Sequence, residues 1–411
     1  MGWLSEVADV KVRPSMMLLG PAFVAAIAYV DPGNVAANVS AGAQFGFLLV
    51  WVIVVANTMA CLVQYLSAKL GLVSGQSLPE AVGVKMRRPT RLAYWLQAES
   101  VAMATDLAEV MGGAIALYLL FDLPLLTGGV ITGAVSLLLL ILKDRRGQQM
   151  FERVITGLLL VIAIGFLTSL FVAPPPAHEV AAGLVPKFAG TESVLLAAAM
   201  LGATVMPHAV YLHSGLARDR HGHPEPGPMR RMLLRVTRWD VGIAMVIAGA
   251  VNLSMLLVAA TNLQGRDNTG SIEGAHAAVG STLGPTVALL FAIGLLASGL
   301  ASSSVGAYAG AMIMQGLLHV RIPMVARRLI TLAPALVILA IGIDPSRALV
   351  LSQVVLSFGI PFALIPLVRL TSDRTLMGDD ANHRVTTALG WLVAALISVL
   401  NVVLIYLTVT G

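Results

Sequence analysis

A carboxylate, a proline, a glycine and an asparagine interrupt an apolar stretch near the start of the chain, in the sequence AYVDPGNVAANVS. Proline removes a backbone donor and clashes with the preceding helical turn, and the adjacent glycine loosens the chain further. The sequence therefore predicts a helix broken at Asp31-Pro32-Gly33-Asn34. Asp31 and Asn34 are three residues apart, so both side chains can direct hard oxygen atoms at one point.

A second break, Met206-Pro207-His208, adds a soft sulfur atom to this chemistry. A thioether beside hard oxygens disfavours Mg²⁺ and Ca²⁺ and suits borderline transition metals. In lipid, freed backbone groups are tolerated only where they line a cavity or are buried in protein. The carbonyls of Ala28 and Ala203, next to the two breaks, are therefore candidate ligands as well.

Ionisable side chains near the breaks are typical of a proton relay. His208 and His213 are five residues apart, so on an intact helix they would point about 140° apart, which favours separate roles over one shared metal. Glu99, Asp106 and Glu109, at offsets of seven and ten residues, share one face of a third apolar stretch. Chains of carboxylates and histidines at membrane depth mark proton pathways. Packing of these carboxylates against arginine is the structural alternative, and both can hold at once.

Three arginines at predicted cytoplasmic helix ends, Arg220, Arg327 and Arg328, can pair with Glu99. Gln353 lies in a late apolar stretch, where it can complete a metal shell or bond a neighbouring helix. The residues alone leave these two interpretations of Gln353 open.

The composition places all of this chemistry inside a membrane. Of 411 residues, 57% are hydrophobic and 11% are charged, against about 25% charged in a soluble domain. The mean hydropathy is +0.87. The single cysteine, Cys61, excludes a disulfide within one chain. The sequence predicts an all-α integral membrane protein, with the lipid bilayer as its surroundings.

Eleven apolar segments are predicted to span this membrane, and most reach the length of about 20 residues that a spanning helix needs. With the N-terminus in the cytoplasm, 23 of the 26 Lys and Arg residues fall on the cytoplasmic side, and only Lys187, Arg266 and Arg347 fall outside. The positive-inside rule therefore predicts a cytoplasmic N-terminus and an extracytoplasmic C-terminus, and the net charge of +5 reflects topology rather than nucleic-acid binding. The segments are 15–43, 46–70, 92–121, 126–142, 151–173, 193–217, 240–261, 284–316, 328–343, 347–370 and 386–409.

The segments divide into two sets of five that enter the membrane from opposite sides. Repeat one covers about 15–173, repeat two covers about 193–370, and an extra helix covers about 386–409. The leading segment of each set contains one of the two breaks. Paired interrupted helices point to a binding site at the bilayer midplane. The whole chain, 1–411, is predicted to be a single transmembrane transporter domain with a 5+5 inverted repeat, discontinuous helices 1 and 6 and an eleventh helix.

The motifs DPGN, GATVMPHAVYLHS and ATDLAE resemble the Nramp family of proton-coupled divalent-metal transporters, most closely its bacterial MntH-type members. The resemblance extends from about Pro14 to Leu407 and implies a LeuT-like fold. It implies a metal site made of Asp31, Asn34, Met206 and the carbonyls of Ala28 and Ala203, with Gln353 as a ligand in some conformations. It implies a proton pathway through His208, Asp106 and Glu109, continued by Glu99, Arg220, Arg327 and Arg328. His213 matches a motif histidine of less defined role.

The function expected from these observations is import of Mn²⁺ or Fe²⁺ together with a proton, by alternating access. We expect a multi-pass protein of the cell membrane, either the inner or the plasma membrane, with no cofactor, no enzymatic activity and no obligatory protein partner. The alternative is a cation-coupled symporter of amino acids or other small solutes with the same fold. That alternative is disfavoured because anionic Asp31 would repel a substrate carboxylate. A channel would not need paired broken helices beside a relay.

Overall fold

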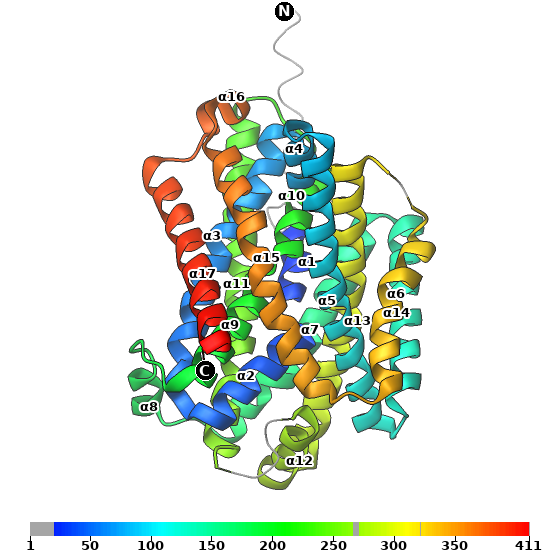
Figure 1. Ribbon diagram of the computed structural model, residues 1–411, viewed down its shortest axis with the longest axis vertical. Helices are drawn as coiled ribbons and strands as arrows, with labels where there is room; N and C mark the ends of the chain where they lie inside the picture. Colours follow the sequence, from blue (N-terminus) through cyan, green and yellow to red (C-terminus); the bar gives the residue numbers. More distant parts are fainter. Residues whose placement is uncertain (1–19, 266–270, 321, 411) are drawn as a thin grey trace, which may run out of the picture.

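The computed structural model describes residues 20–265, 271–320 and 322–410, and every regular element in these ranges is helical. The chain forms one bundle of long helices (Figure 1). The elements of the first half are α1 (Pro21–Ile27), η2 (Ala28–Val30), α2 (Pro32–Phe45), η3 (Gly46–Leu49), α3 (Val50–Ser74), α4 (Leu78–Lys85), α5 (Arg88–Phe121), α6 (Leu125–Arg146), α7 (Gln148–Val172) and α8 (Ala177–Ala182). Those of the second half are α9 (Gly190–Thr204), α10 (Pro207–His221), α11 (Pro228–Asn262), α12 (Ile272–Leu283), α13 (Pro285–Leu318), α14 (Met324–Ile341), α15 (Pro345–Ser372), α16 (Arg374–Met377), η4 (Gly378–Asp380) and α17 (Arg384–Thr410).

Both predicted breaks are present, and the same local rule produces them. Asp31 separates η2 from α2 with φ −69° and ψ 168°, and Met206 precedes α10 with φ −69° and ψ 122°. Each of these residues is followed by a proline, whose ring disfavours the helical region for the residue before it. Pro32 and Pro207 then begin the next half-helix, where a missing N–H costs no hydrogen bond.

The backbone carbonyls released at the first break are satisfied by polar side chains of other helices. The Asn252 amide of α11 donates to the Tyr29 carbonyl at 2.7 Å, and the Ser298 hydroxyl of α13 donates to the Val30 carbonyl at 2.6 Å. Irregular backbone at membrane depth requires such partners because no water is present to replace them. The break is therefore built into the packing of the bundle.

The half-helices α1, α9 and α10 lie in the middle of the bundle in Figure 1, with α17 at one edge and α6 and α14 at the other. Among the described residues, nine helical stretches are long and apolar enough to span a membrane, and the shorter apolar helix Pro21–Val30 accompanies them. Each of the eleven predicted segments overlaps a helix or a pair of half-helices. The number eleven itself is not confirmed, because Pro32–Ser74 is one continuous stretch of 43 residues. Residues 15–19 of the first predicted segment lie outside the described ranges.

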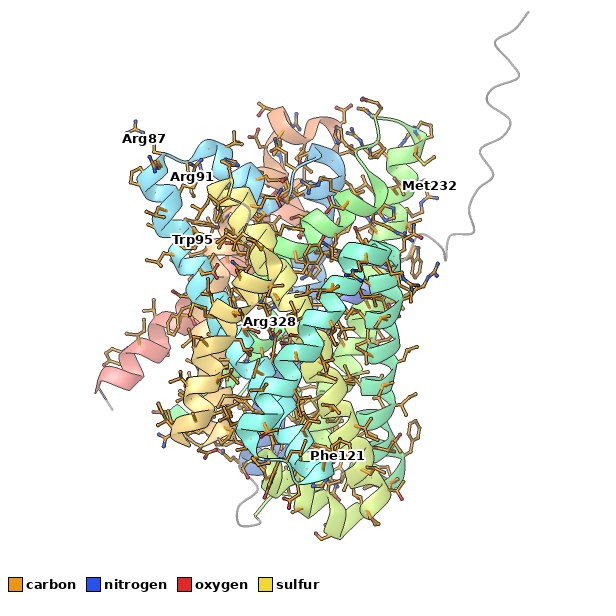
Figure 2. All side chains as sticks on the ribbon, turned by 90° about the vertical axis from the view of Figure 1, so that its right-hand side faces the viewer. Arg87, Arg91, Trp95, Phe121, Met232 and Arg328 are labelled. Carbon is orange, nitrogen blue, oxygen red and sulfur yellow. The ribbon has the colours of Figure 1, made fainter. Side chains whose placement is uncertain are left out.

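The two ends of the bundle differ in character. Helices α4 and α16 lie at one end, and α8 and α12 lie at the other (Figure 1). Figure 2 shows Arg87, which precedes α5, and Phe121, the last residue of α5, at opposite ends of the molecule, so α5 crosses the full bundle. The basic connections between α4 and α5 and between α10 and α11, both predicted to be cytoplasmic, lie at the end that carries α4 and α16 (Figure 1).

Candidate metal site and its ionisable neighbours

Asp31 is fully buried at the first break, where its backbone conformation directs one carboxylate oxygen back toward α2. The backbone N–H of Asn34 donates to Asp31 Oδ1 at 2.7 Å, and the Asn34 side-chain amide donates to the same oxygen at 2.8 Å. The second oxygen, Oδ2, is buried without a hydrogen-bond partner in the described part of the chain. Half of the carboxylate is thus committed to capping α2, and the other half is available to a ligand.

Asn34 joins the two breaks, which are far apart in the sequence. Its side-chain amide also donates to the carbonyl of Ala203, the residue next to the end of α9, at 2.8 Å. Asn34 Oδ1, like Asp31 Oδ2, is buried and receives no hydrogen bond from the described residues. Met206 at the second break has no exposed surface, and neither does Ala28 at the first. The sequence-predicted pairing of the breaks is therefore confirmed, whereas the use of either carbonyl by a metal stays a prediction.

Gln353 of α15 packs against both breaks. A Cβ atom added at Gly33 would lie 1.8 Å from Gln353 Nε2, and one added at Gly202 of α9 would lie 2.0 Å from the Gln353 carbonyl. Only glycine permits this approach of α15 to α2 and α9. Gln353 Oε1 is buried and unpartnered among the described residues, and Nε2 donates to Ser352 at 3.2 Å. Both interpretations of Gln353 remain compatible with this position.

Three buried oxygen acceptors therefore receive no hydrogen bond from the described residues, and they belong to Asp31, Asn34 and Gln353, at or against the joined breaks. An unpaired buried acceptor costs free energy, and a cation would recover it. The described residues contain no group of three or more His, Cys, Asp or Glu side chains arranged to hold a metal ion. A metal held here would thus have a mixed shell of carboxylate, amide and thioether ligands, as the residue types predict.

A vestibule of about 680 Å³ approaches this site from the end that carries α8 and α12. Its lining includes Ser40 of α2, Leu196 of α9 and Val350 of α15, the same three helices that carry Asn34, Ala203 and Gln353. The lining residues are six, seven and three positions from those site residues, which corresponds to about 5–10 Å along a helix. Because Asp31, Asn34 and Met206 have no exposed surface, the site itself is closed in this conformation.

Two of the three carboxylates predicted on one face of α5 form ion pairs with α14. Arg327 donates to both Glu99 oxygens at 2.9 and 3.1 Å. Arg328 binds Asp106 and also contacts Ser303 of α13. The prediction that Arg328 pairs with Glu99 is wrong. Glu99 and Asp106 are seven residues, or two helical turns, apart on α5. The two consecutive arginines of α14 therefore each reach a different one of these carboxylates.

The third carboxylate, Glu109, is fully buried and has no hydrogen-bond partner for either oxygen among the described residues. It packs against Gly306 of α13, where an added Cβ would lie 2.8 Å from Oε2. The arginine alternative considered from the sequence therefore describes Glu99 and Asp106 but not Glu109. A buried carboxyl group of this kind is suited to carrying a proton.

The two histidines occupy separate environments, as their spacing predicts. His208 Nδ1 lies 3.3 Å from Thr105, next to Asp106 on α5. His213 Nδ1 lies 2.6 Å from Gln64 of α3, and the Gln64 amide in turn binds the Tyr29 hydroxyl. The Nε2 atom of each histidine is buried and unpartnered in the described part of the chain. His208 thus faces the carboxylate network, and His213 belongs to a polar chain that leads to η2.

Arg220 does not reach Glu99 as predicted. Its Nε lies 3.6 Å from Glu152 Oε2 of α7, which places it near the start of α1 instead, since Glu152 packs against Gly20. Sequence reasoning missed Glu152 and three residues that support the breaks, Gln64, Asn252 and Ser298. A polar side chain inside an apolar segment is costly unless it is paired, and this signal was available for Gln64 and Asn252.

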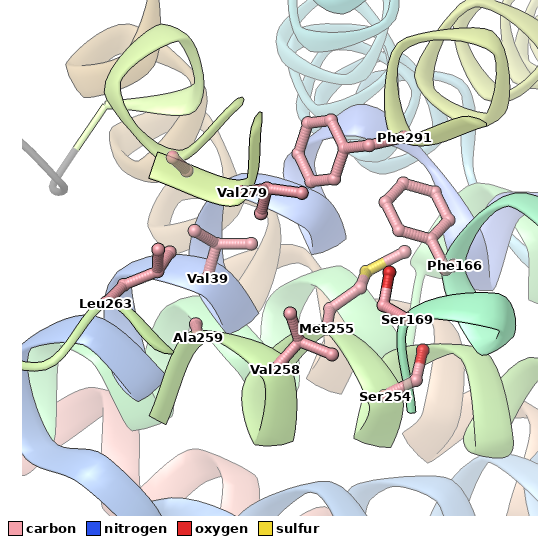
Figure 3. Close-up of a pocket in the computed structure, with 11 residues that line it drawn as sticks. Val39, Phe166, Ser169, Ser254, Met255, Val258, Ala259, Leu263, Val279 and Phe291 are labelled. Carbon is pink, nitrogen blue, oxygen red and sulfur yellow. The ribbon is translucent and has the colours of Figure 1, made fainter. Parts of the chain in front are cut away.

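A separate small cavity of about 10 Å³, room for about one water molecule, lies between α2, α7, α11, α12 and α13 (Figure 3). Phe166 and Phe291 close one side, and the hydroxyls of Ser169 and Ser254 are its polar groups. Its lining residues include no ionisable side chain.

Comparisons with known proteins agree with this geometry. The family model described as "Natural resistance-associated macrophage protein-like" matches residues 22–407. The "Divalent metal cation transporter MntH" of Mycobacterium tuberculosis is 73% identical over 410 residues, covering 100% of this chain and 96% of that protein. The crystal structure of the Eremococcus coleocola manganese transporter, in complex with an aromatic bis-isothiourea substituted compound, is 32% identical with a TM-score of 0.85, covering 95% of this chain and 86% of that one. A nucleobase-cation-symport-1 family transporter, 16% identical with a TM-score of 0.57, covers 94% of this chain and 90% of that one and shares the fold alone.

The broken helices belong to a multi-pass membrane transporter with the LeuT-like fold. The chain is a member of the Nramp family.

Proposed function

We infer that this protein imports divalent transition-metal ions, Mn²⁺ and Fe²⁺, in symport with protons by alternating access. The observation that carries this inference is the cluster of buried acceptors of Asp31, Asn34 and Gln353, beside Met206 at the joined breaks. Family membership supports it, as does the name of the relative from Mycobacterium tuberculosis, divalent metal cation transporter.

In the proposed metal site, Asp31 supplies the anionic oxygen and Asn34 a neutral one. Met206 supplies the soft sulfur that discriminates against Ca²⁺ and Mg²⁺, which prefer shells made only of oxygen. The carbonyls of Ala28 and Ala203 complete the shell from the backbone. Gln353 joins the shell when α15 packs closely against α2. This close packing is what brings its amide against Gly33.

In the proposed proton pathway, a metal ion beside Asp31 favours the ionised carboxylate, so a proton held there is displaced. His208 or Glu109 receives it, because each has a buried atom that forms no hydrogen bond with the described residues and can bind a proton. Asp106 with Arg328 and Glu99 with Arg327 continue the path along α5 toward the end that carries α4. Arg220 pairs with Glu152 of α7, beside the start of α1, instead of continuing this chain of carboxylates.

The transport direction follows from charge. One divalent metal and one proton carry three positive charges inward, and each is worth about 2.3 kcal/mol per 100 mV, or about 7 kcal/mol in total. We place the N-terminus in the cytoplasm and the C-terminus outside the cell membrane, because 23 of 26 Lys and Arg residues then lie on the cytoplasmic side. The vestibule beside Ser40 then opens to the outside, where the metal enters. We propose that no protein partner is required.

The deciding experiment uses purified protein in liposomes that contain a metal-quenched dye and a pH dye, with Mn²⁺ added outside under a negative-inside potential. The wild type is compared with Asp31→Ala and with Asp379→Ala, which removes an exposed carboxylate far from the breaks in sequence. We expect Mn²⁺ entry and lumenal acidification, both lost only in Asp31→Ala. Mn²⁺ entry without acidification would retain the metal site and contradict the proton path. Absence of metal entry in the wild type would favour the alternative, a small-solute symporter.

A further inference from the structure

A groove of about 650 Å³ lies between α4, α15 and α17, at the end of the bundle that carries α16 (Figure 1). It is remote from the metal site and has no part in the transport mechanism described above. Its lining combines apolar and charged side chains, among them Met86, Ile365, Trp391, Lys85, Arg369 and Asp373. This mixture of charged and apolar side chains distinguishes the groove from the apolar helix surfaces around it.

The charged groups of the groove leave one cation uncompensated. Lys85 Nζ lies 3.2 Å from Asp373 Oδ2, and Asp373 also accepts hydrogen bonds from the backbone and hydroxyl of Thr375. Arg369 is exposed, and none of the described residues forms a hydrogen bond or an ion pair with it. The groove therefore contains two cations and one carboxylate, with the Arg369 guanidinium available to an external anion.

Further cations adjoin the groove at the start of α5. Met86 is followed directly by Arg87 and Arg88, and Arg91 lies one turn later, so residues 85–91 contain four basic side chains. Figure 2 shows Arg87, Arg91 and Trp95 in succession down one edge of α5. Clusters of four or more Lys and Arg residues at the cytoplasmic end of a spanning helix attract anionic lipid headgroups.

An apolar surface continues from the groove toward the middle of the membrane. Trp391 is 41% exposed, and tryptophan is enriched at the membrane interface. Phe362 precedes Arg369 by seven residues on the same face of α15 and is 47% exposed, while Leu389 and Leu392 of α17 are 46% and 53% exposed. A molecule bound by Arg369 can thus place hydrocarbon along this surface.

We propose that this groove binds an anionic phospholipid of the cytoplasmic leaflet. The phosphate contacts Arg369 and the cations of residues 85–91, and the acyl chains pack along Ile365, Phe362 and Trp391. Free phosphate would leave the apolar surface unused. A second copy of the chain in the same groove would bring two sets of like charges together, which is unfavourable.

The test is native mass spectrometry of the full-length protein released from nanodiscs that contain equal amounts of phosphatidylglycerol and phosphatidylcholine. We expect phosphatidylglycerol to be retained preferentially by the wild type and about fivefold more weakly by Arg369→Gln, the change expected for one cation near an anionic surface. Arg384→Gln is the matched control, because Arg384 begins α17 at the same end of the bundle but does not line the groove. Arg369→Lys should restore binding, and the melting temperature of each variant reports its folding.

Equal retention of the two lipids by the wild type would overturn the proposal, because it would show an apolar groove without headgroup preference. Equal losses in Arg369→Gln and Arg384→Gln would overturn it too, since the effect would then be one of net charge. Full retention by Arg369→Gln, or a dimer that excludes lipid from this face, would also contradict it. Each outcome is independent of whether the protein transports metal.

Discussion

Gly33→Ala tests whether Gln353 acts at the proposed metal site through its contact with the first break. The added Cβ would lie 1.8 Å from Gln353 Nε2 and 2.3 Å from Cδ, whereas ordinary van der Waals contact begins near 3.4 Å. The amide must therefore withdraw by about 1.6 Å, the difference between 3.4 and 1.8 Å. Withdrawal is feasible because the obstructing atoms, Nε2, Cδ and Cγ, all belong to a flexible side chain, and it removes Oε1 from the break while Asp31, Asn34 and Met206 keep their side chains.

The expected result is a loss of Mn²⁺ affinity of about tenfold, the lower end of the range for a lost supporting residue at a metal site. This corresponds to about 1.4 kcal/mol. Isothermal titration and initial uptake rates in liposomes measure it. Gly157→Ala is the matched control, since nothing lies within 4 Å of a Cβ added there on α7. It carries the same gain in helix propensity, about 0.5–1 kcal/mol, and should leave affinity unchanged.

Comparison with Gln353→Ala decides the interpretation. If the methyl group acts only by displacing the amide, the two variants lose the same affinity and the double variant loses no more than either. Wild-type affinity in Gly33→Ala together with a loss in Gln353→Ala would refute the placement of Gln353. Additive losses would show that the methyl group instead disturbs the backbone of the break.

Three further predictions follow from individual contacts. Met206→Ala should reduce discrimination of Mn²⁺ over Ca²⁺ more than it reduces Mn²⁺ uptake, as measured by competition in liposomes; equal loss of both would contradict the role of the sulfur. Arg328→Met should destabilise the protein by about 3–5 kcal/mol, because it leaves the buried Asp106 carboxylate uncompensated. Adding Asp106→Asn should recover part of that loss of stability, as measured by unfolding curves in detergent. If the effects of the two substitutions on stability are purely additive, the ion pair is not the cause. Hydrogen bonds from the Thr375 hydroxyl and backbone, with Lys85 nearby, lower the pKa of Asp373 from 3.8 to about 2, so its stabilising contribution is present above pH 3.8 and disappears as the pH falls toward 2. The melting temperature of Asp373→Asn should therefore fall below that of the wild type at neutral pH and approach it in acid; a constant difference across this range would exclude the effect.

Local sequence was sufficient for the elements and the breaks. Asp31 and Met206 adopt extended backbone because each precedes a proline, and this preference acts between adjacent residues. The apolar segments are long enough to be recognised without tertiary information, since a segment that faces lipid must satisfy nearly all of its backbone hydrogen bonds within its own helix. The sequence also predicted that the two breaks occupy equivalent positions in the two repeats, because this depends only on the order of segments along the chain.

Partner choice between helices required the tertiary structure. Arg328 binds Asp106 rather than Glu99, and Arg220 binds Glu152, because the rotation and crossing of helices decide which side chains meet. The same holds for Asn34 and the Ala203 carbonyl, 169 residues apart, and for the approach of Gln353 to Gly33. Residue types identify which groups can bind a metal or a proton. Helix packing, which depends on contacts spread over the whole bundle, determines which of those groups lie together and which remain unpaired.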